Sequence, residues 1–196
     1  PIAFTPNVGQ SSPSVDFTAR GAGCSMFFTP SGTTMLLSGQ AAVSAARRAG
    51  ADPDDAAVSQ SFAVACRFLN TNPDVTVEGG DRLSWNNNYF IGSDPDSWRR
   101  DVPNYGSVRY RAIYHGIDLV YYSVDGSLKY DFIVEPGADP SRILVRYDFG
   151  GDDGSLRVTD DGALVAATPL GTITEKRPVC YQVVDGRRRA VDARYE

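Results

Sequence analysis

The chain has 196 residues, of which 42% are hydrophobic and 11% are aromatic, and its 24 acidic and 19 basic residues give a net charge of −5. Disordered chains lack this many apolar and aromatic residues, so the composition favours an ordered globular protein. The acidic balance argues against a nucleic-acid partner, because that affinity comes largely from cations that neutralise phosphates. No apolar run approaches the roughly 18 residues that cross a bilayer, so membrane insertion is not expected.

The N-terminal part of the chain alternates apolar and polar residues, with glycine-containing turns between the alternating runs. Residues 15–19, 24–29 and 33–37 therefore predict a meander of three strands. Residues 39–59 interrupt this pattern, because 41–48 have high helix propensity and a run of Asp and Pro follows them. We expect a loop or one short helix at this insertion.

The middle of the chain combines a clear strand with a long segment that lacks alternation. Residues 61–69 return to a period of two, and 75–78 predict another short strand. Residues 79–105 are rich in Asn, Asp, Gly and Pro, which predicts an irregular segment. That segment also contains Trp85, Tyr89, Phe90 and Trp98. Because such rings bury a large apolar area, we expect the segment to be ordered and packed against the domain.

Residues 117–134 predict a β-hairpin, around which we expect the core to form. Asp125 and Gly126 supply the two positive φ angles that a two-residue hairpin loop needs. Such a loop places most of the large apolar side chains on one face, and that face should be buried. The register that it predicts pairs Val124 with Ser127, Tyr121 with Tyr130, Leu119 with Phe132 and Ile117 with Val134.

The opposite face of this hairpin is a mixed surface that could meet water, a second layer or a ligand. Its candidate residues are Asp118, Tyr122, Lys129 and Asp131. Asp118 and Asp131 lie diagonally on that face, with Lys129 beside them. Two carboxylates placed in this way can carry out glycosidic acid–base chemistry, although they more often balance a lysine. A catalytic pair and a structural charge network both remain open.

Two further hairpins are predicted in the C-terminal third, after a strand at residues 143–149. Around Asp161 we predict a two-residue loop, and around Asp185 a three-residue loop with a glycine bulge. Both choices keep apolar side chains opposite one another. The predicted pairs are Val158 with Val165 and Leu156 with Ala167 in the first hairpin, and Tyr181 with Val191 and Val179 with Ala193 in the second.

The strand pattern also predicts the fold class. About ten to thirteen short strands, with turns every ten or so residues and almost no helical periodicity, are typical of two packed sheets. We therefore predict an all-β fold, an antiparallel two-layer β-sandwich with at most one short helix near 41–48. The length fits a single domain that spans residues 1–196.

The sequence contains no recognisable catalytic, cofactor-binding or metal-binding constellation. His115 is the one histidine, it stands in a predicted turn, and no Gly-x-Ser-x-Gly motif accompanies it. Cys24, Cys66 and Cys180 are too widely spaced for a zinc motif. Cys24 and Cys66 fall on apolar strand faces, which favours buried free thiols, with one disulfide as the alternative. We expect no enzymatic activity, no cofactor and no metal.

The order of several short sequence blocks resembles a known family. The blocks are Phe4 to Gln10, Asn88 to Gly92, Trp98, Val102-Pro103, Tyr105, Tyr114, Gly116 to Tyr122, Leu128 to Phe132, Pro136 to Pro140, Arg177-Pro178 and Tyr181-Gln182. In this combination they resemble a domain of unknown function found near the N-terminus of exported bacterial proteins with SBBP-type β-propeller repeats. That family has no established activity. The resemblance implies a secreted or cell-surface protein whose neighbouring domains are β-propeller repeats or immunoglobulin-like modules.

Three functions are compatible with these observations. The first, which we expect, is a non-catalytic structural or adhesive module of a multi-domain bacterial protein, ahead of a β-propeller repeat region. The second is carbohydrate binding, with an extracellular glycan as partner, by aromatic rings that stack on sugars. Its candidate rings are Trp85, Tyr89, Trp98, Tyr105 and Tyr122. The third is a glycoside-active enzyme built on Asp118 and Asp131.

Overall fold

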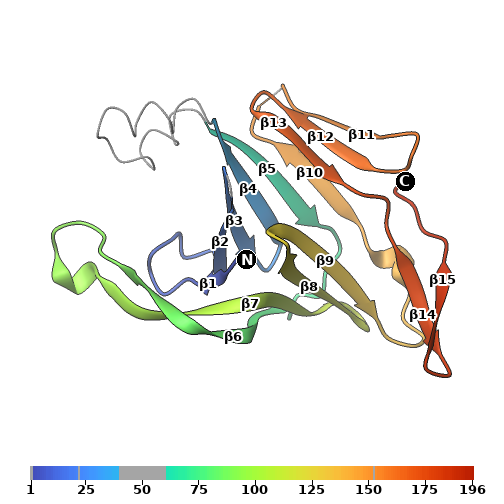
Figure 1. The fold of residues 1–196 in the computed structure, drawn as a ribbon, viewed down its shortest axis with the longest axis horizontal. Coiled ribbons are helices and arrows are strands. Elements are labelled where there is room, and N and C mark those ends of the chain that lie inside the picture. The colour runs from blue at the N-terminus through green and yellow to red at the C-terminus, as the bar shows by residue number, and fades with distance from the viewer. Residues whose placement is uncertain (1, 22, 40–60, 152) are drawn as a thin grey trace.

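The computed structural model of the chain describes residues 2–21, 23–39, 61–151 and 153–196 (Figure 1). These ranges contain fifteen β-strands and two short 3-10 turns, at Pro95–Ser97 and Pro140–Arg142, and no α-helix. None of their helical turns is long and apolar enough to cross a membrane. The predicted all-β class is confirmed, with more strands than the number expected. The short helix expected near 41–48 lies outside the described residues.

Ten of the strands form one antiparallel sheet. They are β1 (Phe4–Pro6), β2 (Phe17–Gly21), β3 (Cys24–Thr29), β4 (Gly32–Ser38), β5 (Ser61–Phe68), β6 (Thr76–Tyr89), β7 (Arg99–Tyr114), β8 (Ile117–Val124), β9 (Ser127–Val134) and β10 (Val145–Phe149). Their order is β10-β5-β4-β3-β2-β1-β7-β8-β9, and β6 pairs with β7 beside this row. The sheet curls, so that the end strands β9 and β10 border the same space (Figure 1).

The inner side of the curled sheet holds the hydrophobic core. Strand alternation sends every second side chain inward. The buried inward residues include Phe4, Phe17, Met26, Phe28, Phe68, Val108, Tyr110, Ile117, Leu119 and Tyr121. Phe28 of β3 joins the two sides of the curl, because its ring meets Phe4 at 5.4 Å and Tyr121 at 5.3 Å, both edge to face. Such pairs contribute about 0.5–1.5 kcal/mol each beyond the area that they bury.

Five further strands form two small sheets. The first is antiparallel and consists of β11 (Ser155–Val158), β12 (Leu164–Thr168) and β13 (Gly171–Glu175). The second is the hairpin of β14 (Cys180–Val184) and β15 (Arg187–Val191). Residues of β13 line the same space as residues of β9 and β10, so the three-stranded sheet adds a second layer there. The whole arrangement fits a sandwich or a half-barrel.

Several local predictions are confirmed. The N-terminal meander consists of β2, β3 and β4, and residues 61–68 form β5. The central hairpin is β8–β9, and all four of the predicted residue pairs occur in it. Ile117, Leu119 and Tyr121 on its predicted core face are at most 5% exposed. Where the turn type and the buried face agree, the register follows from the sequence.

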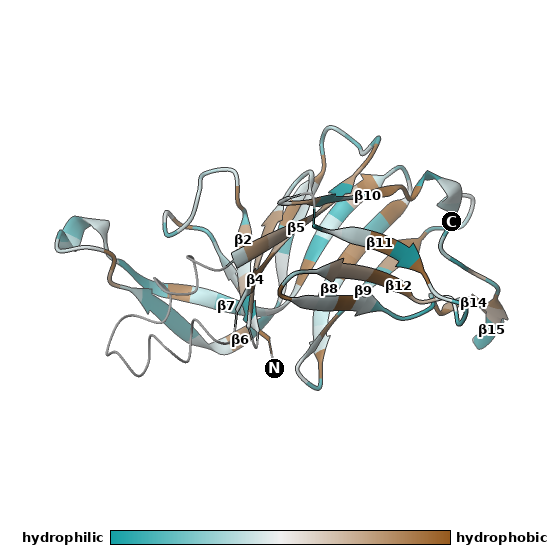
Figure 2. Ribbon diagram, turned by 90° about the horizontal axis from the view of Figure 1, so that it is seen from above, coloured by the Kyte–Doolittle hydropathy of each residue, from teal (hydrophilic) through white to brown (hydrophobic). Residues whose placement is uncertain are grey.

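The segment 79–105 is not irregular, contrary to the prediction. β6 and β7 run through most of it and pair as a long two-stranded arm (Figure 1). Most residues in the outer part of the arm are exposed on both faces, and Figure 2 colours that part mainly as hydrophilic. Because both faces of the arm are exposed, its sequence lacks the alternation of apolar and polar residues. Nor are its rings all packed, because Trp85 is 48% exposed and Phe90 is 62% exposed.

The β11–β12 hairpin has a register one residue away from the predicted one. Val158 pairs with Leu164 in place of Val165. The N–H of Thr159 donates to the carbonyl of Ala163 at 2.8 Å, which leaves a loop of three residues and not two. The Thr159 hydroxyl also donates to that carbonyl at 3.0 Å. These local hydrogen bonds select the longer loop.

The β14–β15 hairpin lacks the bulge that was predicted. Val183 pairs with Arg188, and Asp185 and Gly186 alone form the loop. Their φ angles of 52° and 72° are those of a two-residue turn with both central residues left-handed. Nearly every residue of this hairpin is exposed, so no buried face selects the register and the turn decides it.

Candidate functional site

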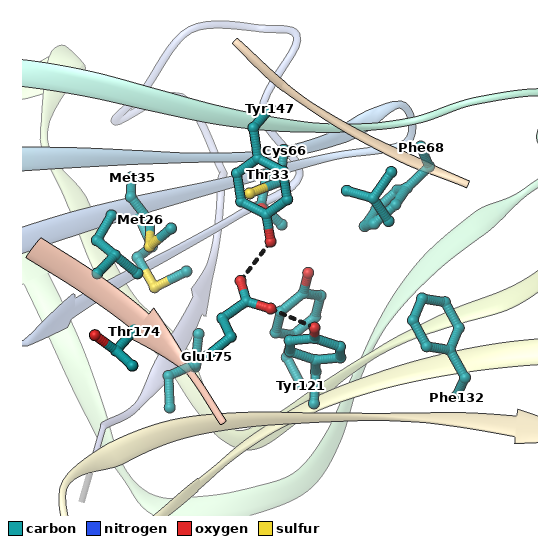
Figure 3. A pocket seen from close by; sticks show the side chains of 14 residues that line it. Met26, Thr33, Met35, Cys66, Phe68, Tyr121, Phe132, Tyr147, Thr174 and Glu175 are labelled. Atoms are coloured by element: carbon teal, nitrogen blue, oxygen red, sulfur yellow. Dashed lines mark hydrogen bonds between the residues drawn. The ribbon is translucent and has the colours of Figure 1, made fainter. Parts of the chain in front are cut away.

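A cavity of about 140 Å³, which we call the inner cavity, lies between β9, β10 and β13 (Figure 3). Its wall is mostly apolar and includes Met26, Met35, Phe68, Leu128, Phe132 and Ile173. The charged group in this wall is Glu175, at the end of β13. Figure 3 shows the Glu175 side chain with Met26 and Met35 on one side and Phe68 and Phe132 on the other.

The Glu175 carboxylate is held by three tyrosine hydroxyls. Tyr130 of β9 donates to Oε2 at 2.6 Å, and Tyr195 donates to the same oxygen at 3.3 Å. Tyr147 of β10 donates to Oε1. β9 and β10 stand at the two ends of the strand order and do not pair with each other. Glu175 therefore connects them through side-chain hydrogen bonds and not through a backbone ladder. The carboxylate therefore joins the small sheet to both edges of the large one.

The tyrosines of this cluster remain protonated donors over the ordinary pH range. Burial raises the pKa of Tyr130 far above its usual value, and the adjacent Glu175 charge raises it further. Burial raises the pKa of Tyr147 in the same way, with further contributions from Cys66 and Glu175. A tyrosinate beside the carboxylate would place two negative charges together in a poorly solvated space. The cluster is therefore a set of hydroxyl donors around one acceptor.

The inner cavity also contains the Cys66 thiol. Burial, together with the Glu175 charge, raises the pKa of this thiol to about 12. The thiolate is the nucleophilic form of cysteine, so a thiol with this pKa is unreactive near neutrality. All three cysteines are free, with Cys66 buried, Cys24 half-buried and Cys180 exposed. Within the described part of the chain, no three His, Cys, Asp or Glu side chains are grouped to hold a metal ion.

The residues predicted as a possible ligand surface share one face of β8–β9, and Asp118 on that face supports the backbone. Its Oδ1 accepts the N–H of Ala112 at 2.7 Å. The register of β7 against β8 shifts between Tyr110 and Tyr114, and Ala112 has a φ of 48° within that irregularity. Arg109 lies 3.8 Å from the Asp118 carboxylate. Asp118 therefore satisfies a donor that the bulge removes from the ladder.

The other predicted residues of that surface pair among themselves. The Tyr122 hydroxyl donates to Oδ2 of Asp131 at 3.0 Å, and Lys129 lies opposite Tyr122 in the ladder. Asp118 and Asp131 thus have different partners, and neither of them lines the inner cavity. The structure brings these four residues to one face of one hairpin, as the sequence predicts, but not to a cavity around both carboxylates.

One protein family matches nearly the whole chain. The model of the family described as a domain of unknown function, DUF7948, matches residues 4–196. The chain belongs to this family. No curated protein and no solved structure matches it. Family membership confirms the resemblance to a domain of unknown function. It does not bear on export or on SBBP repeats, and it assigns no role to any residue of the DUF7948 domain.

The candidate sugar-stacking rings of this DUF7948 domain do not form one flat platform. Trp98 meets Phe90 edge to face at 5.2 Å, with 88° between the ring planes, and its Nε1 donates to the carbonyl of Gly92. Tyr105 packs against Phe17 of the core at 6.0 Å and 78°. Trp85 is 48% exposed, whereas Trp98 is half-buried. These rings therefore lie in separate settings.

Sequence analysis missed the cluster around Glu175. The sequence places Tyr130 on the core face of the central hairpin and Tyr147 in the strand predicted at 143–149, but it indicates no partner for either hydroxyl. The available signal was the run 171–175, in which Glu175 shares the phase of Ile173. A carboxylate on the apolar phase of a strand indicates a buried or half-buried charge that needs donors. The identity of those donors depends on how β13 lies against the large sheet.

Proposed function

We propose that the chain is a non-catalytic structural or adhesive module of a secreted or cell-surface, multi-domain bacterial protein. In this proposal the β14–β15 hairpin docks on a neighbouring domain of the same polypeptide. The resemblance noted in the sequence supports the compartment and the neighbours, which would be β-propeller repeats or immunoglobulin-like modules. The exposed apolar face of the hairpin is the observation that supports the docking.

The β14–β15 hairpin exposes apolar side chains that a monomer normally covers. Val183 is 65% exposed and Tyr181 is 48% exposed, and Val179, directly before β14, is 89% exposed. Tyr181 and Val183 lie on the same face, because they are two residues apart in one strand. A two-stranded hairpin by itself is marginally stable in water. A surface that covers this face would stabilise the hairpin and remove apolar area from water at about 25 cal/mol per Å².

Charge indicates the chemistry of the partner surface. Arg187, Arg188 and Arg189 stand directly after the turn of this hairpin, and the Arg188 guanidinium lies 4.4 Å from the centre of the Tyr181 ring. The hairpin therefore presents an apolar strip with a basic end. The complementary surface is an apolar patch bordered by carboxylates on the neighbouring domain, because complementary charge sets the orientation of docking.

Hydrogen exchange tests this proposal. Amide exchange would be compared between this chain alone and the natural polypeptide that contains it. We expect the amides of β14–β15 to exchange at least about tenfold more slowly in the longer polypeptide, because docking suppresses local opening. Val183→Asp and Arg188→Glu should remove that protection, and Val124→Asp, at an exposed position of β8, should not. Equal exchange of β14–β15 in the two samples would refute the docking.

Carbohydrate binding is a second candidate, which the arm of β6 and β7 favours. Trp85 is 48% exposed, and Asn86 and Asn88 near it in the strand are exposed as well. Their Oδ1 atoms accept from Arg82 and from the N–H of Asp101, so their amide N–H groups are the donors that could meet sugar hydroxyls. A glycan array tests it, with Trp85→Ala as the matched variant. Retention of a bound glycan by the wild-type chain and its loss in the variant would establish this role, and an array without signal would exclude it for the glycans present.

A further inference from the structure

The inner cavity holds a negative charge without a positive partner. Glu175 forms no ion pair among the described residues, and no Lys, Arg or His lines the cavity. A carboxylate that is half-buried loses hydration, and it needs hydrogen-bond donors or a cation to replace that hydration. The tyrosine hydroxyls supply donors but no charge. No cationic side chain in the wall of the cavity therefore offsets the charge of Glu175.

The carboxylate also keeps room for one more donor. An ionised carboxylate accepts about four hydrogen bonds, two at each oxygen. Oε2 accepts from Tyr130 and Tyr195, whereas Oε1 accepts from Tyr147 alone. Oε1 thus has a remaining acceptor site, and it belongs to a side chain that lines the cavity. A donor with a positive charge would form the strongest hydrogen bond there.

The rest of the wall suits the apolar part of such a ligand. The rings of Tyr121, Tyr130 and Phe132 line the cavity together with the thioethers of Met26 and Met35. Aromatic faces attract cations through their quadrupole, and thioethers are polarisable and adapt to the shape of a guest. An anion would be repelled by Glu175. A neutral guest would gain contact with the wall but not the charge-assisted hydrogen bond.

The volume limits the size of the guest. A cavity of about 150 Å³ in another protein accommodates benzene, which has six non-hydrogen atoms. The inner cavity measures about 140 Å³, so a guest of about five or six non-hydrogen atoms fits. Tyr130, Tyr147 and Glu175 are each half-buried, so solvent reaches the rim from which a guest would enter.

We propose that the inner cavity is a binding site for a small organic cation, a primary ammonium with a short apolar tail. The ammonium donates to Oε1 of Glu175, and the tail contacts the aromatic rings and the two thioethers. None of the residues that line this site belongs to the docking face of β14–β15. The proposal holds or fails independently of the proposed function, because the two use different residues.

The two methionines of the chain make a direct test possible. The sequence contains only Met26 and Met35, and both line the inner cavity. Protein labelled with ¹³C at the methionine methyl groups therefore gives two NMR signals, each a reporter of the cavity. Three probes of matched length would be titrated at pH 7: n-butylammonium, n-butanol and butyrate. We expect n-butylammonium to shift both signals, with a Kd on the order of 1 mM for so small a guest.

Selectivity for charge distinguishes this proposal from simple cavity filling. We expect n-butanol to bind at least about tenfold more weakly than n-butylammonium, and butyrate not to bind. Glu175→Gln keeps the shape and an acceptor oxygen, and it should remove the preference for the ammonium without weakening n-butanol. Ile173→Trp, which fills the cavity from β13, should abolish binding of both probes.

Two outcomes would overturn the proposal. One is the absence of any change in the two methionine signals with n-butylammonium up to high millimolar concentration. The other is equal affinity for n-butylammonium and n-butanol in the wild-type chain, which would mean that the cavity recognises apolar volume and not charge. The second outcome needs no variant, so the test remains decisive even where Glu175→Gln fails to fold.

Discussion

The hairpins β8–β9 and β14–β15 have the same turn and opposite surroundings. Each is closed by Asp-Gly, with φ angles of 50° and 77° at Asp125 and Gly126 and of 52° and 72° at Asp185 and Gly186. Each has a two-residue loop and a continuous ladder. One face of β8–β9 lies in the core, whereas nearly all of β14–β15 is exposed.

This difference shows how the turn and the burial of apolar side chains each contribute to the register of a hairpin. In β8–β9 the turn and the apolar face require the same register, so either feature alone predicts it correctly. In β14–β15 the apolar residues would match better with a bulge, yet the hairpin takes the two-residue loop of its turn. Without a buried face, matching apolar side chains across the ladder gains little, and the local conformational preference of Asp-Gly decides.

The largest expected difference between the hairpins is in the free energy of unfolding after an apolar side chain is shortened. Leu119→Ala removes a fully buried side chain of β8 and should lower the free energy of unfolding by about 3 kcal/mol. Val183→Ala, at a position of β14 that is 65% exposed, should change it by less than about 0.5 kcal/mol. Urea unfolding of the isolated chain measures both. A comparable loss in the two variants would show that β14–β15 is covered within this chain.

Alkaline pH should lower the free energy of unfolding through the buried tyrosines of β8–β9. The pKa of Tyr121 and the pKa of Tyr130 are raised, chiefly by burial, so both stay protonated in the folded state while their unfolded counterparts ionise above about pH 10. Their contribution to the free energy of unfolding is complete below pH 10. Above pH 10 it is lost by up to about 1.4 kcal/mol per pH unit for each tyrosine. Urea unfolding at pH 8, 10 and 11 measures this fall. Tyr121→Phe should make it less steep, and an unchanged slope would contradict the assignment.

A glycine substitution in each turn compares the hairpins at equal local strain. A Cβ at Gly126 or at Gly186 would meet no atom within 4 Å, so alanine there adds only the strain of a left-handed φ. That strain is about 1 kcal/mol. In Gly126→Ala it should lower global stability in urea. In Gly186→Ala it should speed amide exchange of β14–β15 and leave the urea midpoint unchanged.

The smallest effect is expected from the cation–π contact of the exposed hairpin. Arg188 lies 4.4 Å from the centre of the Tyr181 ring, and an exposed contact of this kind contributes about 0.5 kcal/mol. Arg188→Gln should therefore raise exchange rates in β14–β15 about twofold without an effect on β8–β9. Arg187→Gln, one residue away and on the other face, is the matched control. If both variants behave alike, the contact has no specific role.

Much of the fold could be predicted because strand alternation and turn chemistry are local. The meander, β5, the β8–β9 register and the all-β class all follow from such signals. The arm could not be predicted, because β6 and β7 pair with each other in solvent and their outer residues show no alternation. The β11–β12 register depends on hydrogen bonds between Thr159 and Ala163, which lengthen the loop by one residue.

The candidate site was less accessible to sequence reasoning than the fold. The polar face with Asp118 and Asp131 was found because it lies within one hairpin. The cluster at the inner cavity joins Glu175 to Tyr130 and Tyr147, which are 45 and 28 residues away in the chain. No short sequence pattern indicates that two inward-facing tyrosines share one carboxylate as their hydrogen-bond acceptor. Their meeting requires the curl of the sheet and the placement of β13.

By itself, the sequence determined the strands that have a buried face and the turns that close them, because alternation and the φ preferences of Asp-Gly act over a few residues. Only the tertiary structure decided how far the ten-stranded sheet curls, that β9 and β10 do not pair with each other, and that Glu175 lies between them. The reason is physical: these features depend on side chains from distant strands that share one enclosed space, where a charge must find its donors.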